Sequence, residues 1–191
     1  MARELVGAYL IRRLPDGSRA IGRLVEVEAY LGDGSDPASH SHNGPTRRNG
    51  AMFGPPGRMY VYRSYGIHLC ANVVCEPEGS GAAVLFRALE PVEGTGWMRR
   101  RRGLPGDAPE RAVASGPGRL SQALALGLAD DRRSLLRGHL ALRRAPTSER
   151  PPQVGTSPRI GISRGVELPF RFFDSASTCV SRRAASRARR R

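Results

Sequence analysis

The sequence predicts a single mixed α+β domain. Its 191 residues, 39% of them hydrophobic, suffice for one core, because single domains commonly contain about 100 to 200 residues. β-rich runs dominate the first half of the chain, whereas helical spacing of apolar residues occurs only in the second half. We find no internal repeat and no change of composition that indicates a second domain.

The expected strands are separated by recognisable turns. Residues 9–14 and 19–30 are β-rich runs joined by Pro15-Asp16-Gly17-Ser18, which predicts a hairpin. A polar, Gly-rich segment follows at 31–50. Further strands are expected in 59–75 and 82–91.

The second half of the chain contains the helical signals. The apolar spacing predicts helices at 91–102 and, more clearly, at 117–126. Pro, Ser and Thr in 145–157 predict a loop, after which 159–163 and 168–173 are short β-rich pieces. We expect the domain to span 1–181 and to be followed by a disordered basic tail at 182–191.

The charge of the chain indicates a polyanionic partner. Its 31 basic residues stand against 17 acidic ones, for a formal net charge of +14. Every one of the 31 is an arginine, so chemistry that needs a lysine side chain is excluded. Part of this excess reflects compositional bias, so any single arginine can be an ordinary surface residue.

Membrane, disulfide and metal functions are not expected. No apolar run approaches the roughly 18 to 20 residues of a membrane span, and no secretory signal is evident, so we expect a cytoplasmic protein. Cys70, Cys75 and Cys179 have neither disulfide nor zinc-ligand spacing. No metal or other cofactor is expected.

Two carboxylates share one face of the predicted strand 19–30. The strand period of two places Glu26, Glu28 and Tyr30 on the same side. An exposed polar face would explain this pattern as well as a catalytic site would. The opposite, core-facing side is expected to hold Val25, Val27 and Ala29.

Tyrosines are concentrated in the predicted strand region 59–65. Tyr60, Tyr62 and Tyr65 are three of the five tyrosines of the chain. Tyr62 and Tyr65 are three residues apart and therefore face opposite ways on a regular strand. One can line a pocket while the other projects from a hairpin tip. Aromatic rings on a basic surface are typical of nucleic-acid binding, although they can equally be ordinary strand residues.

Several longer motifs follow one another along the chain: EVEAYLG, DPASHS, MFGPPGRMYVYRSYGIHLCANVV, LFRALEP, SGPGRLSQAL and RIGIS. In these motifs and their order, the chain resembles the alkylpurine DNA glycosylases over residues 2–181. In that family the fold is one mixed domain around a curved antiparallel sheet, with a protruding β-hairpin that enters the DNA minor groove.

The resemblance implies a water-based mechanism. Glu28 matches the general base that activates the attacking water, while Arg87 and the backbone carbonyl near Ile160 match the remainder of that water's site. A neighbouring Arg87 is expected to keep Glu28 ionised despite burial. Glu26 matches no catalytic position and is interpreted as structural.

The resemblance also implies how a damaged base is held. Tyr30, His40 and Tyr62 match the residues that enclose the flipped base, and Asn72 matches the residue that crowds the 2-amino group of normal guanine. Tyr65 matches the wedge that fills the gap in the base stack. An enzyme must extrude a base to act on it, and an inserted side chain offsets part of that cost.

The expected partner is double-stranded DNA that contains damaged purines. Arg47, Arg48 and Arg63 are assigned to the DNA backbone, and we expect a monomer that associates with the bacterial nucleoid. The predicted activity is monofunctional base excision that leaves an abasic site.

Two other functions remain as alternatives. A non-catalytic basic nucleic-acid-binding protein would explain the charge and the tail. A carbohydrate hydrolase could use Glu26 and Glu28 as an acid pair, but the tyrosines and the net charge argue against it.

Overall fold

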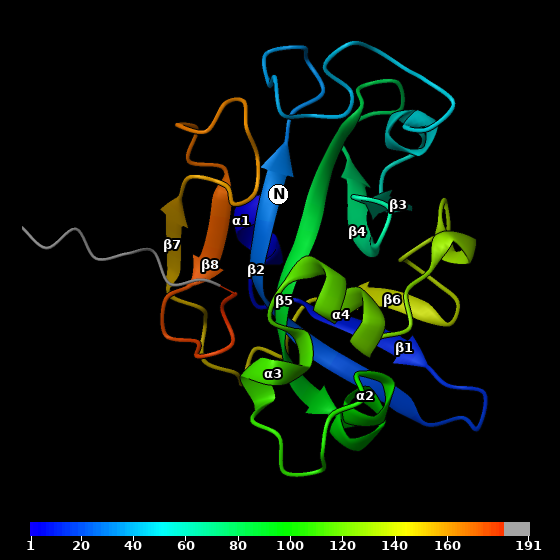
Figure 1. The fold of residues 1–191 in the computed structure, drawn as a ribbon, viewed down its shortest axis with the longest axis vertical. Helices are drawn as coiled ribbons and strands as arrows, with labels where there is room; N and C mark the ends of the chain where they lie inside the picture. Colours follow the sequence, from blue (N-terminus) through cyan, green and yellow to red (C-terminus); the bar gives the residue numbers. More distant parts are fainter. Residues whose placement is uncertain (182–191) are drawn as a thin grey trace, which may run out of the picture.

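The computed structural model describes residues 1–181, and one antiparallel sheet forms their centre (Figure 1). Six strands follow the order β3-β4-β5-β2-β1-β6, while β8 pairs with β2 and β7. The predicted tail at 182–191 lies outside the described residues. The strands are β1 (Tyr9–Arg13), β2 (Arg19–Tyr30), β3 (Met59–Ser64), β4 (His68–Cys75), β5 (Ala82–Glu93), β6 (Leu140–Arg143), β7 (Val154–Ser157) and β8 (Arg171–Asp174).

The helices are short and lie mainly on one side of the sheet (Figure 1). Helices α3 and α4 contact β5, and α2 contacts both α4 and β2. Within residues 1–181, no helix is long and apolar enough to cross a membrane. The helices are α1 (Ala2–Leu5), α2 (Thr95–Arg101), α3 (Glu110–Ala114) and α4 (Pro117–Ala123), with 3₁₀ turns η1 (Gly50–Phe53) and η2 (Leu128–Asp130).

The main core lies between the sheet and these helices. Phe86 and Leu89 of β5 pack in one cluster with Met98 of α2 and Leu120 of α4, all of them inaccessible to solvent. Burying side chains of this size stabilises the fold by about 1.5–3 kcal/mol each. The mixed α+β class with a curved antiparallel sheet is therefore confirmed.

The long strand β2 changes its neighbour along its length. Arg19–Arg23 pairs with β1, whereas Glu26–Glu28 pairs with β8. Between these parts the ladder with β5 is irregular around Glu26, and such a bulge bends a strand and interrupts its alternation.

The predicted alternation is wrong at Val25 because of this bulge. Val27 packs in the main core, but Val25 packs in a separate cluster with Ala88, Cys179 and Val180. The carboxylates of Glu26 and Glu28 are both fully buried, because β8 and the segment around Val180 cover this part of the strand. The face is therefore an interior polar site and not an exposed one.

Strands β3 and β4 form a tight hairpin. Ile67 N–H donates to Ser64 O across the turn, and the two central residues, Tyr65 and Gly66, have φ of 49° and 72°. Turns with both central residues left-handed match the twist of hairpin strands. Tyr65 is 86% exposed and Ile67 is 72% exposed. The hairpin is present, and its protrusion into DNA stays a prediction.

Several elements differ from the sequence predictions, and α3 and β6 were not predicted. Strand β5 continues through Glu93, which pairs with Ile21, so helix α2 begins only at Thr95. The loop expected at 145–157 ends in strand β7, which pairs with β8. The β-rich piece expected at 159–163 is not a strand, and its Ile160 N–H donates to the Glu28 carboxylate.

Candidate active site

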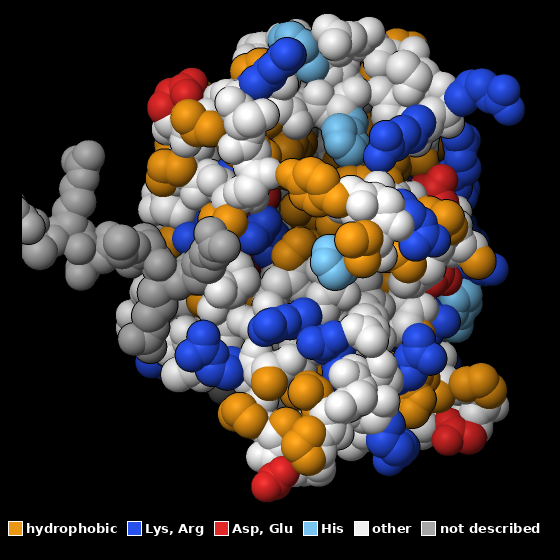
Figure 2. Space-filling view, viewed as in Figure 1, with side chains coloured by type: hydrophobic (Ala, Val, Ile, Leu, Met, Phe, Trp, Pro, Cys, Tyr) orange, Lys and Arg blue, Asp and Glu red, His pale blue; other side chains and the backbone are white. Residues whose placement is uncertain are grey.

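A cavity of about 800 Å³ opens between the β3–β4 hairpin, the start of α4 and the loop that follows β2. In the space-filling view, apolar side chains and histidines surround the hollow at the centre of this face, with arginine side chains above and below it (Figure 2). Arg48, Arg102 and Arg119 are among its lining residues. Among the described residues that line it, none is an aspartate or glutamate. The arginines therefore favour contact with an anionic group of a ligand, whereas the aromatic and apolar lining favours a planar or apolar part of it.

Glu28 lies directly behind the wall of this cavity. Its Oε1 accepts a hydrogen bond of 2.7 Å from Ile160 N–H. Its Oε2 accepts one of 3.0 Å from the Tyr30 hydroxyl and one of 3.2 Å from Arg87 Nη1. Tyr30, Arg87 and Ile160 all line the cavity, so each residue that contacts the carboxylate also faces the space where a ligand would lie.

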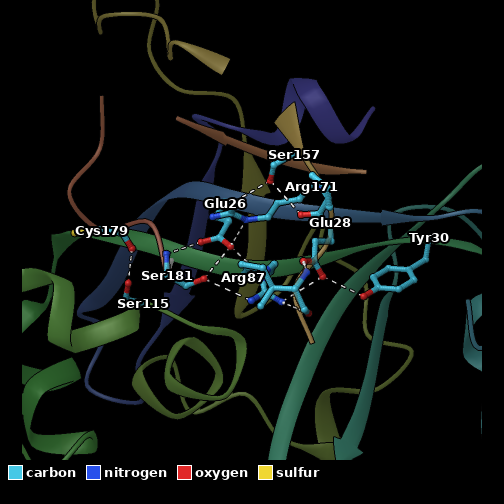
Figure 3. Close-up of polar contacts among 11 residues, drawn as sticks. Glu26, Glu28, Tyr30, Arg87, Ser115, Ser157, Arg171, Cys179 and Ser181 are labelled. Carbon is cyan, nitrogen blue, oxygen red and sulfur yellow. Dashed lines mark hydrogen bonds and ion pairs between the residues drawn. The ribbon is translucent and has the colours of Figure 1, made fainter. Parts of the chain in front are cut away.

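Arg87 is held in place by a second carboxylate. Its Nε donates to Glu26 Oε1 at 2.8 Å, which leaves Nη1 directed at Glu28 (Figure 3). The same Nη1 lies 3.5 Å from the backbone oxygen of Ile160. One guanidinium group therefore joins Glu28 to the carbonyl that sequence reasoning assigned to the water site.

Glu26 is fully engaged by donors. Arg171 Nε donates to Oε1 at 2.8 Å, and the backbone N–H of Ser181 donates to Oε2 at 2.6 Å (Figure 3). Ser181 Oγ adds a bond of 2.8 Å to Oε1. Its position supports the interpretation of Glu26 as a structural residue and leaves it unsuited to act as an acid.

The two carboxylates differ in their proton affinity. Burial raises the pKa of Glu28 above its ordinary value, although Arg87, Ile160 N–H and Tyr30 act in the opposite direction. Burial acts in the same way on Glu26, but Arg87 and Arg171 outweigh it and lower its pKa. The expectation that Arg87 offsets the burial of Glu28 therefore holds only in part. A base with a raised pKa accepts a proton more readily.

Aromatic rings form one wall of the cavity. Tyr60 and Tyr62 are stacked with centroids 5.3 Å apart, and His40 meets Tyr62 edge-on at 4.6 Å. His40 Nδ1 also hydrogen-bonds to the Tyr60 hydroxyl at 2.8 Å. Partial burial and the charge of Arg48 lower the pKa of His40, which favours the neutral imidazole. This wall therefore offers aromatic surface to a ligand, and a neutral His40 would not repel a positively charged one.

The floor of the cavity is closed by strand β4. Asn72 is buried and its Nδ2 donates to Tyr60 O at 3.0 Å. Burial raises the pKa of the neighbouring Cys70 thiol, so this side chain stays protonated. Within residues 1–181, no group of three or more His, Cys, Asp or Glu side chains could hold a metal ion.

The structure brings most of the predicted site residues together. Arg48, as well as lining the cavity, donates from Nη2 to Arg63 O at 3.1 Å and so ties the loop to the hairpin. Arg47 and Arg63 are exposed outside the cavity. The cavity-lining members of the predicted set are Tyr30, His40, Arg48, Tyr62, Tyr65, Asn72, Arg87 and Ile160.

Several residues of this region were not predicted from the sequence. Tyr60 shares a strand face with Tyr62, so the period of two could have found it. Asp36 and Arg159 lie within motifs quoted above, and they form a buried ion pair of 2.6 Å. Arg171 and Ser181 carried no local signal, because the fold alone brings them to Glu26 from 145 and 155 residues away.

Comparison with known proteins gives a consistent family match. Residues 1–178 match the family model described as methylpurine-DNA glycosylase. This match covers nearly all of the described chain, including every strand and helix of the site.

Relatives of similar length share about half of their residues with this chain. A protein of Rhodopseudomonas palustris is 52% identical over 172 residues, which cover 90% of this chain and 77% of the relative. One of Chlorobaculum tepidum is 49% identical over 183 residues, covering 95% and 85%. One of Methanoculleus marisnigri is 46% identical over 185 residues, covering 96% and 93%. Each carries the name "Putative 3-methyladenine DNA glycosylase".

Proposed function

The chain belongs to the methylpurine-DNA glycosylase family and is thus a DNA glycosylase, and we propose that it excises 3-methyladenine and related alkylated purines from duplex DNA. The observation that carries this proposal is the position of Glu28 behind a cavity whose lining residues Tyr30, Arg87 and Ile160 all contact it. The product would be a free base and an abasic site.

The aromatic wall supports recognition of a cationic base. A purine alkylated at N3 or N7 carries a positive charge, and such a cation is attracted to the face of an aromatic ring by about 0.5–2 kcal/mol. Tyr30 and Tyr62 line the cavity from β2 and β3, so a base between them would meet two rings. Normal neutral purines would gain less from the same rings. Asn72, which is buried and lines the cavity, would crowd a base that carries an additional amino group.

The base must leave the duplex to enter this cavity. Extrusion costs a few kcal/mol, and an inserted side chain offsets part of it. Tyr65 is exposed at the hairpin tip and also lines the cavity mouth. It would fill the vacated position in the stack while the base occupies the cavity.

The chemical step would use Glu28 as the base. A water held by Glu28, Arg87 Nη1 and the Ile160 carbonyl would attack C1′ of the sugar and transfer its proton to Glu28. The electron pair of the N-glycosidic bond would pass to the departing purine and cancel its positive charge. The Glu28 carboxylate would also stabilise the oxocarbenium-like sugar as the bond breaks.

The binding-only alternative does not account for the buried charges. Burying carboxylates is costly unless they are paired, and a protein that only binds phosphates does not need Glu28 beside an aromatic cavity. The acid-pair alternative requires the Glu26 carboxylate to act on a substrate, whereas Arg87, Arg171 and the Ser181 N–H already occupy it.

A single-turnover assay of Glu28→Gln tests the proposal. Duplex oligonucleotides bearing 3-methyladenine, 7-methylguanine, hypoxanthine or ethenoadenine are incubated with excess enzyme, and free base is quantified. We expect the variant to lose at least about a hundredfold in rate while it binds lesion DNA nearly as well as wild type, because general-base catalysis contributes about 10²–10⁴-fold.

Glu149→Gln is the matched control, since Glu149 is a half-buried carboxylate whose contact with Arg23 is a weak 3.9 Å ion pair. It should retain the wild-type rate. A Glu28→Gln enzyme that kept most of its rate would remove Glu28 from the mechanism and favour the binding-only function.

A further inference from the structure

Arg159 is a buried arginine behind the candidate site. Its side chain is inaccessible to solvent, and its two terminal nitrogens donate to Asp36 at 2.6 and 2.7 Å. Nη1 also donates to Ala29 O at 3.0 Å. A buried arginine is tolerated only when paired and hydrogen-bonded in this way. The pair thus joins three segments: the end of β2, the loop after it and residues 158–162.

The guanidinium group also covers one face of Tyr30. Its Cζ lies 4.6 Å from the centroid of that ring and 5.3 Å from that of Phe170. Tyr30 lines the cavity whereas Arg159 does not. The guanidinium therefore packs on the Tyr30 ring without itself lining the cavity.

Arg159 immediately precedes Ile160 in the chain. The peptide that links the two residues supplies the N–H that donates to Glu28 at 2.7 Å. Tyr30 supplies the hydroxyl that donates to the other oxygen at 3.0 Å. Two donors to Glu28 therefore depend on Arg159. The Ile160 N–H belongs to the peptide that follows Arg159, and the Tyr30 ring packs against the Arg159 guanidinium.

We propose that Arg159, anchored by Asp36, is a positioning residue that holds the Tyr30 hydroxyl and the Ile160 N–H on the Glu28 carboxylate. The proposal deepens the function above and rests on it for the catalytic role of Glu28. It assigns to the Asp36–Arg159 pair a part in catalysis that its burial alone would not indicate.

Asp36 is suited to be the anchor because its own position is fixed. Its Oδ2 accepts from Leu31 N–H at 3.1 Å and its Oδ1 accepts from Ala38 N–H at 3.1 Å. A carboxylate held by two backbone donors cannot follow a displaced arginine, so it determines where the guanidinium lies. The geometry at Glu28 is therefore set from the loop that also carries His40.

Several charged or titratable groups face Glu28, and each contributes to its titration. Arg87 lowers its proton affinity and Glu26 raises it. Arg159 and Cys70 also interact with it electrostatically, and Arg171 is its neighbour on β8. Hydrogen-bond donors to a carboxylate stabilise its charged form. Loss of the Arg159 anchor should thus raise the pKa of Glu28 further.

Three variants separate positioning from charge. Arg159→Gln removes the charge and the paired donors, Arg159→Lys keeps the charge without the two-pronged contact, and Asp36→Asn keeps the arginine but weakens its anchor. Arg12→Gln is the control, because Arg12 pairs with Asp130 at 3.3 Å in another part of the sheet. Folding is checked by circular dichroism at the assay temperature.

The first readout is the pH dependence of the single-turnover rate on lesion DNA. For all three Asp36 and Arg159 variants we expect a rate about tenfold lower at neutral pH, with the acid limb displaced upward by about one pH unit. Affinity for lesion DNA should change less than about twofold. The double variant Asp36→Asn/Arg159→Gln should be no worse than Arg159→Gln, because the pair acts as a unit.

The second readout does not require activity. The side-chain carboxyl carbon of Glu28, assigned in ¹³C NMR spectra with the help of Glu28→Gln, is titrated in wild type and variants. An upward displacement of its titration in Arg159→Lys supports positioning even if no base release is detected, in which case the proposed function fails separately.

Two results would overturn the proposal. One is that Arg159→Lys has the pH profile and the Glu28 titration of the wild type. Arg159 would then act on Glu28 through its charge alone and not by positioning its donors. The other is a set of folded variants that differ from wild type only in melting temperature, as expected for Arg12→Gln.

Discussion

The backbone N–H of Ile160 donates a 2.7 Å hydrogen bond to the side chain of Glu28, from a position 132 residues later in the sequence. Arg87 Nη1 contacts the same carboxylate and lies 3.5 Å from the Ile160 carbonyl. The backbone N–H and the backbone carbonyl of Ile160 therefore both contact the Glu28–Arg87 pair. An attacking water placed there would find one acceptor in Glu28 and another in the carbonyl, which fixes the orientation of both its protons.

The pH dependence of excision should reveal the environment of Glu28. Glu28 must be ionised to take a proton, and burial raises its pKa above the ordinary 4.5. The rate should therefore fall as the pH decreases through a value above 4.5, measured as the acid limb of the single-turnover rate against pH.

Arg87→Met should displace that limb further upward, because the nearby positive charge is what most opposes the effect of burial. Arg23→Met is a control from the same sheet, since Arg23 pairs with Glu90 and Asp174 and not with Glu28. An acid limb that stays in the same place in Arg87→Met would show that another group controls the titration.

Tyr65 should affect extrusion of the base without affecting stability. It is 86% exposed, so Tyr65→Ala should change the free energy of unfolding by less than about 0.5 kcal/mol. The single-turnover rate on duplex lesions should fall about tenfold to a hundredfold, which corresponds to about 1.4–2.8 kcal/mol of uncompensated unstacking. Val166→Ala, at an exposed position outside the cavity, should leave the rate unchanged.

The deficit of Tyr65→Ala should shrink when the lesion lies opposite an abasic site, where less stacking is lost on extrusion. An equal deficit on both substrates would argue that Tyr65 contributes to the cavity and not to the wedge.

Features that depend on residues close together in the sequence could be predicted, whereas contacts between distant segments mostly could not. The hairpins β1–β2 and β3–β4 could be predicted because their turn residues and alternation are local. The resemblance placed Glu28, Arg87 and Ile160 at one site, and the structure brings these three together. Their catalytic roles stay predictions.

What could not be predicted depends on tertiary contacts. The bulge near Glu26 displaced Val25 from its expected face. No single residue type in this segment predicts such a bulge. Segment 159–163 has the apolar pattern of a strand, yet the ion pair of Arg159 with Asp36 holds its start as a loop. A buried partner 123 residues away outweighs local β propensity.

Binding should weaken steeply with salt. Phosphates neutralised by arginine release counterions, so log K should decline by about 0.9 per phosphate contact for each unit of log[salt]. Deletion of residues after Ser181 removes several of the arginines of this +14 chain. That deletion should lower nonspecific affinity and the salt slope, both measured by fluorescence anisotropy.

The same deletion should leave the single-turnover rate at saturating enzyme unchanged, provided that Ser181 is retained, because its backbone N–H and Oγ donate to Glu26. A reduced rate at saturation would place part of 182–191 within the catalytic domain and move the predicted domain boundary.

The absence of lysine from the sequence predicts that the DNA strand is left intact. Glycosylases that also nick DNA displace the base with an amine and pass through an imine, whose protonated form permits elimination of the 3′ phosphate. No lysine side chain exists in this sequence to supply such an amine. The N-terminal amine lies 3.2 Å from Glu4, outside the residues that line the cavity. Water should therefore be the nucleophile.

The expected product is an intact strand with an abasic site that breaks only on later treatment with alkali or heat. Borohydride, which reduces a protein–DNA imine to a stable adduct, should trap nothing during turnover, as judged by denaturing electrophoresis of labelled DNA. A lysine-dependent bifunctional glycosylase run in parallel verifies that the trapping conditions work. A covalent adduct with this chain would require an amine nucleophile, most simply Met1, and would contradict both the water mechanism and the role of Glu28 as its base.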